Sequence, residues 1–377
     1  MIILGIETSC DETSVGIVEQ KDNQLTIKAN VTATSLQLHS KTGGIIPEIA
    51  AREQVKYMLP VLQQALKKGL NFDLSKYQIL NTKYSVPIDA IAVTYGPGLI
   101  GSLLVGVETA KTLSYICNKP IIPVNHMLGH IYANWLSPSL SIINSPLSIQ
   151  FPALALVVSG GHTDLLLLKN HSEYEVLGGT RDDAAGECFD KCARLLGFDY
   201  PGGPKIAELA KKGDNKAFHF PRPMLGSHDA DFSFSGLKTS FLNMTKQHLP
   251  LSRTTIPNSK AGWVQTPVEN DLSDKEKVVL YNLCASLEKA IVDTLVKKTM
   301  HAAEEHGVKS ILISGGVAAN DLLREQFEKQ TVQMGINFFA PTKDLCTDNG
   351  AMIAAAAFFN NKPVNWQDIT VDPELYY

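Results

Sequence analysis

The chain has 377 residues, which is long enough for two ordinary domains. Hydrophobic residues make up 44% of it and charged residues 19%, a composition typical of globular proteins that bury a sizeable core. The formal net charge of -4 excludes the overall basic excess of a typical nucleic-acid-binding protein. Any contact with nucleic acid must therefore come from a local basic patch or from a partner.

The six cysteines are scattered and form no C-x-x-C pair, so we expect no disulfide framework and favour a reducing compartment. The first residues, MIILGIETSC, lead directly into a strand pattern and lack the basic and long apolar segments of a leader peptide. No apolar run reaches about 18 residues, so we expect no transmembrane helix and no membrane contact. These features predict a cytoplasmic protein.

The first half of the chain predicts three strands followed by alternating helices and strands. Apolar runs and period-2 alternation over residues 2–6, 14–18 and 25–33 predict an antiparallel meander. Hydrophobic periodicity and glycine or proline boundaries then predict a helix at 47–68, a strand at 88–94, a helix at 103–117, a strand at 120–124 and a helix that contains HMLGH.

The same pattern starts again after a Ser/Pro-rich break. We expect strands at 153–159, 163–169, 173–178, 311–314 and 336–340, and helices at 277–305, from 321 and at 349–359. Because the second half opens as the first does, we expect two α/β lobes, each with a mixed sheet flanked by helices, and a cleft between them. Three segments rich in Ser, Thr, Asn and Pro are interpreted as insertions or mobile loops: 75–87, 137–150 and 249–274.

The segment PVNHMLGHIYANW contains two histidines, His126 and His130, four residues apart. On a helix this spacing places both imidazoles on one face, one turn apart, where they can chelate a divalent metal ion. The alternative is that they are ordinary surface or core histidines. A zincin metalloprotease is disfavoured, because that pattern needs Glu directly after the first histidine and this chain has Met127 there, followed by Leu128.

Each expected lobe begins with a polar turn between two strands, ETSCDET in the first and SGGHT in the second. Two such turns facing one cleft can hold a phosphate chain through backbone N–H groups and hydroxyls, which makes Ser9, Cys10 and Asp11 candidate phosphate contacts. Gly160 and Gly161 permit close backbone approach and positive φ. A single SGG turn is more often an ordinary hairpin, but its counterpart in the other half favours a nucleotide site.

The SGGVAAN segment connects an expected strand to an expected helix, and Asn320 at its end can hydrogen-bond a base or ribose. Alone, such a segment is more often a plain connection. A P-loop is excluded, because Val107 stands where the spacing needs lysine. The GPGLIG segment has the spacing of a dinucleotide fingerprint, but it follows the fourth strand and lacks the acidic partner.

The densest acidic cluster is RDDAAGECFDK. On a helix, Asp183, Glu187 and Asp190 would share one face, either as a solvated helix start or, for Asp190, as a contact to a ribose diol or an amino-acid hydroxyl. The FSFSGLKT segment is either core packing or a cleft edge for a polyanion. Asp348 is either the N-cap of the last helix or a carboxylate that faces the cleft.

These motifs together resemble the universal tRNA threonylcarbamoyladenosine synthases, in the bacterial TsaD form once called O-sialoglycoprotein endopeptidase. The resemblance runs from residue 2 to about 359 and rests on GIETSCDETS, PEIAAREQ, GPGLIGSLLVG, PVNHMLGH, VVSGGHT, DDAAGECFDK, YPGGP, FPRPM, DFSFSGLKT, SGGVAAN and CTDNGAM. It implies the two-lobe α/β fold of actin, sugar kinases and heat-shock chaperone ATPases, the ASKHA fold, with the ligand in the cleft. The implied lobes are 1–136, with 341–377 packing back on it, and 151–340, joined by a linker at 137–150.

The resemblance also implies an activity and a site. Members transfer threonylcarbamoyl from threonylcarbamoyl-AMP to N6 of adenosine 37 in tRNAs that read codons beginning with A. They work with TsaB and TsaE partners in bacteria, and a separate enzyme makes the adenylate. The implied metal ligands are His126, His130 and Asp348, with Fe2+ favoured and Zn2+ as the alternative. The implied substrate contacts are Val157, Val158, Ser159, Gly160, Gly161, Asp190, Gly203 and Asn320.

The chain departs from the family pattern inside the histidine motif. Leu128 stands where an acidic residue is expected, and Asn125 where a third histidine is often found. Neither is an implied ligand, so metal binding is expected to survive with a different outer shell. The start without a presequence argues against the mitochondrial branch. Two alternatives stay open: an ATPase or sugar kinase of the same fold, and a non-enzymatic, nucleotide-gated scaffold of a tRNA-modifying complex.

Overall fold

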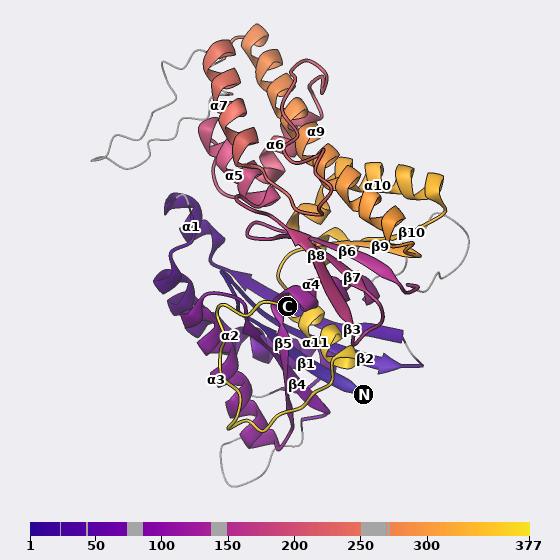
Figure 1. The fold of residues 1–377 in the computed structure, drawn as a ribbon. Coiled ribbons are helices and arrows are strands. Elements are labelled where there is room, and N and C mark those ends of the chain that lie inside the picture. Colours follow the sequence, from indigo (N-terminus) through magenta and orange to yellow (C-terminus); the bar gives the residue numbers. More distant parts are fainter. Residues whose placement is uncertain (23, 43, 74–85, 137–148, 250–268, 270–271) are drawn as a thin grey trace. The chain divides into compact units, whose positions relative to one another are not determined.

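The computed structural model describes residues 1–22, 24–42, 44–73, 86–136, 149–249, 269 and 272–377 (Figure 1). The chain divides into two compact units, Met1–Leu140 with Pro341–Tyr377, and Ser141–Ala340. Most of the three expected insertions, including most of the expected linker at 137–150, lies outside the described residues. Of the helices in the described ranges, none combines the length and the apolar character needed to cross a membrane.

The first unit is built on a five-stranded sheet in the order β3-β2-β1-β4-β5. Strand β1 pairs antiparallel with β2 and β2 with β3, which confirms the expected meander, while β1 pairs parallel with β4 and β4 with β5. The elements are β1 (Ile2–Glu7), β2 (Glu12–Lys21), β3 (Gln24–Thr34), α1 (Leu36–Thr42), α2 (Pro47–Leu70), β4 (Ala90–Gly96), α3 (Ile100–Cys117), β5 (Ile121–Asn125), α4 (His126–Tyr132), η2 (Ala133–Trp135), η5 (Lys343–Leu345) and α11 (Gly350–Phe359).

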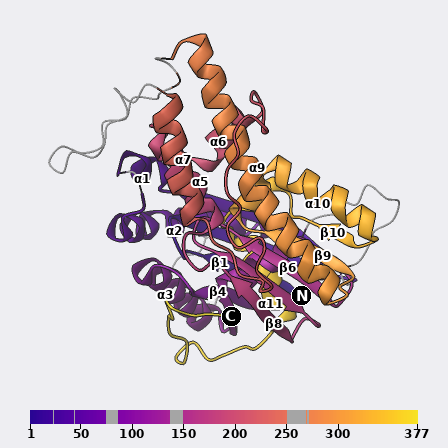
Figure 2. The same ribbon diagram turned by 45° about the horizontal axis from the view of Figure 1, so that its top comes forward.

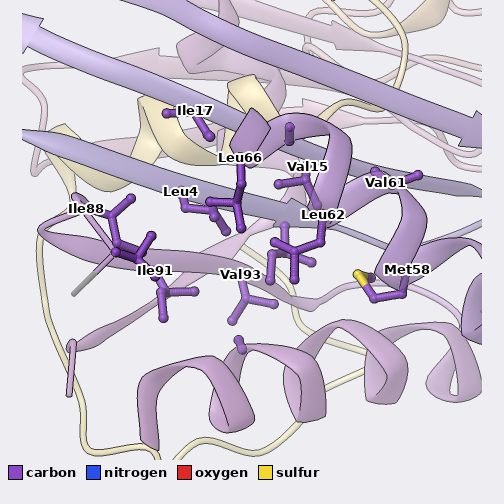
Figure 3. Close-up of a cluster of buried hydrophobic side chains, with 14 of the residues drawn as sticks. Leu4, Val15, Ile17, Met58, Val61, Leu62, Leu66, Ile88, Ile91 and Val93 are labelled. Atoms are coloured by element: carbon purple, nitrogen blue, oxygen red, sulfur yellow. The ribbon is translucent and has the colours of Figure 1, made fainter. Parts of the chain in front are cut away.

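One face of this sheet packs against α2 and α3 around an apolar core (Figure 3). Strand residues Leu4 and Val15 meet Met58, Leu62 and Leu66, which recur every four residues along α2 and therefore line one side of that helix. Burying a large apolar side chain of this kind contributes about 1.5–3 kcal/mol relative to leaving it exposed. This face anchors the strands whose ends carry the candidate site.

The second unit repeats the topology of the first. Its five strands have the order β10-β9-β6-β7-β8, with β6, β7 and β8 as an antiparallel meander and β9 and β10 parallel to β6 and to each other. The long helix α9 packs against α6, α7 and α10, and both views show α10 beside it (Figures 1 and 2). The elements are β6 (Ala153–Val158), β7 (Thr163–Leu168), β8 (Tyr174–Gly179), α5 (Ala185–Leu195), α6 (Gly203–Ala210), α7 (Ser235–His248), α9 (Asp274–Glu305), β9 (Ser310–Ser314), η4 (Gly316–Ala319), α10 (Asp321–Met334) and β10 (Asn337–Phe339).

The expected helix over the acidic cluster is present, but its start is later than the cluster. Helix α5 begins at Ala185, so Asp183 precedes it and the prediction that Asp183, Glu187 and Asp190 share a helical face is wrong for Asp183. Its carboxylate lies 2.7 Å from Lys191 Nζ, which also contacts Glu187 Oε1 at 2.8 Å. The lysine thus neutralises two of the three acids.

Candidate functional site

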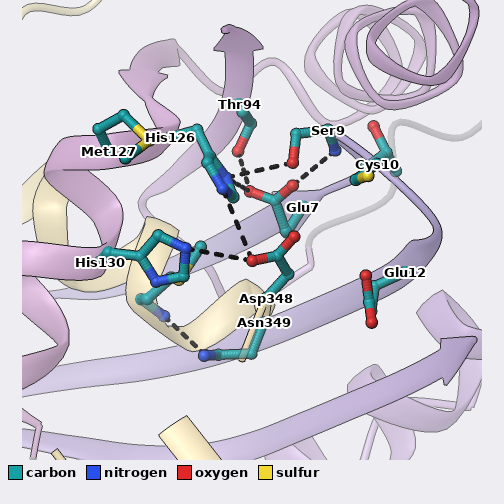
Figure 4. A network of polar contacts seen from close by, with 12 residues as sticks. Glu7, Ser9, Cys10, Glu12, Thr94, His126, Met127, His130, Asp348 and Asn349 are labelled. Carbon is teal, nitrogen blue, oxygen red and sulfur yellow. Dashed lines mark hydrogen bonds and ion pairs between the residues drawn. The ribbon is translucent and has the colours of Figure 1, made fainter. Parts of the chain in front are cut away.

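Three side chains with metal-ligating groups meet in the first unit. His126 and His130 come from α4, and Asp348 comes from the segment before α11 (Figure 4). One ligand atom from each lies within 4.8 Å of the others. Asp348 Oδ1 is 3.1 Å from His130 Nε2 and 3.6 Å from His126 Nε2, so both imidazoles present the same nitrogen to one carboxylate. The histidines are 8% and 2% exposed, which makes this a built site and not a surface coincidence.

Helix α4 starts directly at the end of strand β5, and Asn125 makes this possible. Its Oδ1 accepts hydrogen bonds from Met127 N at 2.8 Å and Leu128 N at 3.3 Å, so Asn125 is the N-cap of α4. His126 is therefore the first helical residue and His130 lies one turn later, as the spacing predicted. Asn125, which departs from the expected motif, thus has a structural role.

The position of Asp348 depends on glycines in the two strands below α11. A Cβ atom at Gly5 would lie 2.2 Å from Gly350 O, one at Gly16 would lie 2.1 Å from Ala351 N, and one at Gly350 would lie 2.2 Å from Gly16 N. Contacts this short are impossible for real side chains, so the backbone of α11 lies against β1 and β2 only because all three residues are glycine. Since Leu4 faces α2, Gly5 faces the opposite side of the sheet, where α11 packs.

Asn349, and not Asp348, caps α11. Asn349 Oδ1 accepts a hydrogen bond from Met352 N at 2.9 Å, and its Nδ2 donates to Thr347 O at 2.8 Å. The interpretation of Asp348 as the N-cap is therefore wrong. Its carboxylate instead faces the two histidines, and the cap next to it fixes the direction of the chain there.

A buried glutamate that the sequence patterns did not reveal supports His126 from the other side. Glu7, the last residue of β1, places Oε2 3.0 Å from His126 Nδ1. Thr94 Oγ1 donates to the same oxygen at 2.5 Å, and Ser9 N donates to Oε1 at 2.6 Å. Ser9 Oγ also lies 3.2 Å from His126 Nδ1. The available signal was a charged residue at the end of the apolar run IILGIE.

Negative charge gathers around the two imidazoles. Burial alone would lower the pKa of His126, but Glu7 and Asp348 outweigh it and raise that pKa to about 9. Burial, with Asp348, Asp11 and Glu7, raises the pKa of Glu12 well above its ordinary value, and burial with nearby acidic residues raises the pKa of the Cys10 thiol. Carboxylates crowded out of water in this way are suited to a divalent cation, which offsets their mutual repulsion.

The candidate phosphate turn of the first unit is tied to its surroundings. Cys10 O accepts from Gln54 Nε2 at 3.0 Å and from Ser102 Oγ at 3.1 Å, and Asp11 O accepts from Ser35 N at 3.1 Å. Of the three candidate residues, Ser9 lies beside a ligand, with its Oγ 3.2 Å from His126 Nδ1, and Cys10 is close enough to Asp348 that burial and this carboxylate together raise the pKa of its thiol. A phosphate contact by this turn stays a prediction.

The matching turn of the second unit is open. Ser159 Oγ accepts from Gly161 N at 3.4 Å and from His162 N at 3.2 Å, while a Cβ atom at Gly160 or Gly161 would have no atom of the described residues within 4 Å. Neither glycine uses the positive φ that glycine permits, because the serine hydroxyl closes the turn without a left-handed residue. The glycines leave room for a ligand to approach the backbone.

The SGGVAAN segment and α5 both pack closely against the end of strand β6. Val157 and Val158 are buried, and a Cβ atom at Gly315 (φ 87°) would lie 2.5 Å from Val158 O. A Cβ atom at Gly186, in the first turn of α5, would lie 2.4 Å from Ser159 O. Glycine at these two places brings the SGGVAAN segment and α5 against the open turn.

The polar residues implied as substrate contacts already have partners within the second unit. Asp190 Oδ1 accepts from Gly202 N at 2.7 Å and from Gly203 N at 3.2 Å, which holds the YPGGP turn, and burial raises the pKa of this carboxyl despite those bonds. Asn320 is the N-cap of α10, where its Oδ1 accepts from Leu323 N. Its Nδ2 donates to Glu288 Oε1 at 2.6 Å, a buried partner that the sequence did not indicate. Contact of these residues with a substrate stays a prediction.

The FSFSGLKT segment packs as core. Phe232 and Phe234 are fully buried, which confirms the core interpretation for both aromatic side chains. Between and after them, Ser233 Oγ and Ser235 Oγ donate to Asp182 Oδ2 at 2.6 and 2.7 Å. Hydrogen bonds from this segment therefore tie the start of α7 to Asp182 of the acidic cluster.

Comparison with known proteins identifies the family. The family model TsaD, described as tRNA N6-adenosine threonylcarbamoyltransferase, matches residues 26–355. Curated proteins with that name include one from Thermosipho africanus, 44% identical over 359 residues (95% of this chain, 94% of the relative), and one from Listeria innocua, 43% identical over 380 residues (99% and 96%). A third, from Bacillus subtilis, is 44% identical over 357 residues, with 94% and 89% coverage.

Among solved structures, T. kodakarensis HypF is similar with a TM-score of 0.55 at 15% identity. The match covers 96% of this chain but 47% of HypF, so the chain spans about half the length of that protein. At this identity the likeness concerns the fold alone. With the two repeated sheets, it confirms the expected two-lobe, actin-like α/β fold. The expected family is also confirmed: the chain belongs to the TsaD family of tRNA N6-adenosine threonylcarbamoyltransferases.

Proposed function

We propose that this chain transfers the threonylcarbamoyl group of threonylcarbamoyl-AMP to N6 of adenosine 37 in tRNAs that read codons beginning with A, and does so in the cytoplasm. Membership of the family supports the reaction type. The structural observation that carries the chemical part is the convergence of His126, His130 and Asp348 within 4.8 Å of one another. An ATPase or sugar kinase would not need this cluster.

The donor set of the cluster fits a divalent transition metal. Two imidazole nitrogens and one carboxylate oxygen are the ligands of many Fe2+ and Zn2+ sites, and two histidines with one carboxylate leave positions open for substrate. We propose Fe2+, with Zn2+ as the alternative. When bound, the ion would supply a Lewis acid at the mixed carbamoyl-phosphate anhydride of the donor.

In the proposed transfer, a bond forms between N6 of adenine and the carbamoyl carbon, and the bond from that carbon to the phosphate oxygen breaks, releasing AMP and one proton. The N6 amine is a weak nucleophile, so positioning must supply much of the acceleration. The open turn Ser159, Gly160 and Gly161 suits the donor's phosphate, because both glycines are exposed and a Cβ atom at either would meet no described atom within 4 Å. Asp190 and Asn320, with Gly203, would hold the adenylate from the elements that meet there.

A TsaB-type partner, expected from the family, would bind the outer face of α2 and α3. These two helices pack on each other, yet Val55 and Leu59 of α2 are 64% and 69% exposed. Ile100 and Leu104 of α3 are exposed as well. Pairs four residues apart on adjoining helices form an apolar face of the kind that a helical partner covers. A TsaE-type protein and lysine or arginine side chains along the tRNA backbone would complete the assembly.

The test combines metal analysis with product detection. Purified protein is incubated with threonylcarbamoyl-AMP, a tRNA that reads such codons, and TsaB- and TsaE-type partners, and the modified nucleoside is quantified by mass spectrometry. His126→Ala should lose bound metal and reduce transfer by more than about 100-fold, the upper end of the effect of an outer-shell change. His301→Ala, at an exposed residue of α9, is the matched control and should retain both.

Three results would overturn parts of the proposal. Full metal content and full activity in His126→Ala would remove the metal assignment. Modification that persists with a variant lacking all three ligands would favour the scaffold alternative. ATP-dependent phosphorylation of a sugar, without modification of tRNA, would favour the kinase alternative.

A further inference from the structure

We infer that Glu7 is a positioning residue of the candidate metal centre: it holds His126 with Nδ1 protonated, so that Nε2 is the atom presented to a metal ion. The inference rests on the proposed metal-dependent function. It concerns a residue outside the cluster of His126, His130 and Asp348, which contacts His126 through the imidazole Nδ1.

The carboxylate of Glu7 is held in place by hydrogen bonds to both of its oxygens. Glu7 is fully buried, and each oxygen has a fixed donor: Ser9 N at 2.6 Å for Oε1, and Thr94 Oγ1 at 2.5 Å for Oε2. The remaining contact of Oε2 is His126 Nδ1 at 3.0 Å. A carboxylate can only accept hydrogen bonds, so Nδ1 must donate, and the lone pair of the neutral ring is then on Nε2. That nitrogen faces Asp348 Oδ1 at 3.6 Å.

His130 differs from His126 on the Nδ1 side of its ring. His130 Nε2 lies 3.1 Å from Asp348 Oδ1, but His130 Nδ1 is buried and has no hydrogen-bond partner among the described residues. The contact of His130 with Asp348 is on the Nε2 side, and no described group accepts a proton from its Nδ1. The two candidate ligands are therefore unequal: a carboxylate on the side away from Asp348 sets the imidazole of His126, whereas the imidazole of His130 has no such partner among the described residues.

Glu7→Gln tests the role of the carboxylate with the least change in shape. In Glu7→Gln one oxygen becomes an NH2 group with nearly the same shape. Ser9 N can only donate, so the amide oxygen must stay at the Oε1 position. The NH2 group then faces His126 Nδ1 and Thr94, whose hydroxyl can turn to accept. The amide donates to Nδ1, which moves the ring proton to Nε2 and blocks the ligand lone pair.

The experiment measures metal affinity without substrates, so it is independent of transfer activity. Zn2+ or Co2+ affinity is determined by competition with a chelator for the wild type, Glu7→Gln and Thr94→Val. Glu7→Gln should bind about 10- to 100-fold more weakly, the usual cost of losing an outer-shell partner of a metal-bound histidine. Thr94→Val, which keeps Glu7 and removes one of its donors, should change affinity by less than about 3-fold, because the carboxylate still sets the ring.

A second readout separates positioning from a merely structural effect. Long-range proton–nitrogen NMR of the Zn2+-loaded wild type should show His126 protonated at Nδ1, and the Glu7→Gln protein should lose this signal while its remaining spectrum stays dispersed. Wild-type affinity in Glu7→Gln, or an unchanged Nδ1 proton, would overturn the inference.

If the wild type binds no metal, the proposed metal-dependent function fails, but Glu7 can still be tested. The tautomer of metal-free His126 is then read at a pH at which the NMR signals show its ring to be neutral. There, an Nδ1 proton in the wild type and an Nε2 proton in Glu7→Gln support the role of Glu7 in orienting the ring. The same tautomer in both proteins contradicts it.

Discussion

The two units share one sheet topology but differ in the turn between their first two strands. In the first unit, buried Glu7 ends β1, and the turn that follows carries buried Ser9 and Asp11. In the second unit, the turn after β6 carries Gly160 and Gly161, where an added Cβ atom would have no neighbour within 4 Å among the described residues. The equivalent turns of the two units thus differ: buried acidic side chains surround the turn of the first unit, whereas the turn of the second unit exposes its glycine backbone.

The difference shows that topology supplies the location and side chains supply the chemistry. Both turns lie where an antiparallel pair is followed by parallel strands, so both are at the same edge of their sheet. Within the described residues, only the first sheet is followed by a helix, α4, that brings two histidines to this edge. Carboxylates with imidazoles suit a cation, whereas open N–H groups suit an anion.

The largest expected effect comes from Gly16→Ala, which would prevent α11 from packing against β2 in the first unit. The new Cβ atom would lie 2.1 Å from Ala351 N, a backbone atom that cannot turn away. We expect a loss of about 3 kcal/mol or more in the free energy of unfolding, the upper range for overpacking, together with weaker metal binding as Asp348 moves. Urea denaturation and chelator competition measure the two effects.

Gly160→Ala is the matched control in the turn of the second unit. Its Cβ atom would enter open space and its φ is not positive, so the free energy of unfolding should change by no more than about 0.5 kcal/mol. Equal destabilisation by the two alanines would contradict the contrast between a filled and an open region.

Metal removal should affect the two units unequally. A bound ion stabilises the protein by about 2.7 kcal/mol when its concentration is 100 times its dissociation constant. Chelation should therefore speed amide hydrogen exchange in α4 and at the start of α11, where the three ligands lie, and leave exchange in β6 and β7 unchanged. Uniform changes across both units, measured by mass spectrometry, would show that the site is not local to the first.

A smaller effect is expected at Asp182 in the second unit. The pKa of this carboxyl is lowered, whereas the pKa of Glu12 in the first unit is raised. Burial raises the pKa of Asp182, but hydrogen bonds from Ser233, Phe234 N and Ser235 outweigh it, so the pKa lies below the ordinary 3.8. The carboxylate therefore stabilises the fold above pH 3.8, and this contribution disappears as the pH falls through the lower folded-state pKa.

Asp182→Asn should lower the free energy of unfolding at neutral pH by about 1 kcal/mol, the typical value of a helix-capping acceptor. The difference from the wild type should begin to shrink below pH 3.8 and disappear as the pH falls through the lower folded-state pKa, because Asp182 is then neutral in both the folded and the unfolded state. Urea denaturation at a series of pH values measures this. A difference that stays constant with pH would show that hydrogen-bond geometry, and not charge, is responsible.

Much of the fold followed from local pattern. Period-2 apolar runs predicted the meander of β1, β2 and β3, and a helical period predicted α2 through the set Ile49, Val55, Met58, Leu62 and Leu66. Of this set, Val55 is exposed on the finished helix. The pairing of His126 with His130 was also local, because a helix fixes the geometry of residues four apart. An error arose at the start of α5, which begins at Ala185, so Asp183 precedes the helix and does not share its face.

Local sequence was enough to show which residues could serve as ligands and on which elements they lie. It could not show that Asp348 faces the histidines and leaves the cap to Asn349, because that depends on α11 resting against Gly5 and Gly16, more than 300 residues away. Nor did it show that Glu7 sets the imidazole of His126, since the two are 119 residues apart. Close packing of segments remote in the chain decided both, and no local periodicity encodes such contacts.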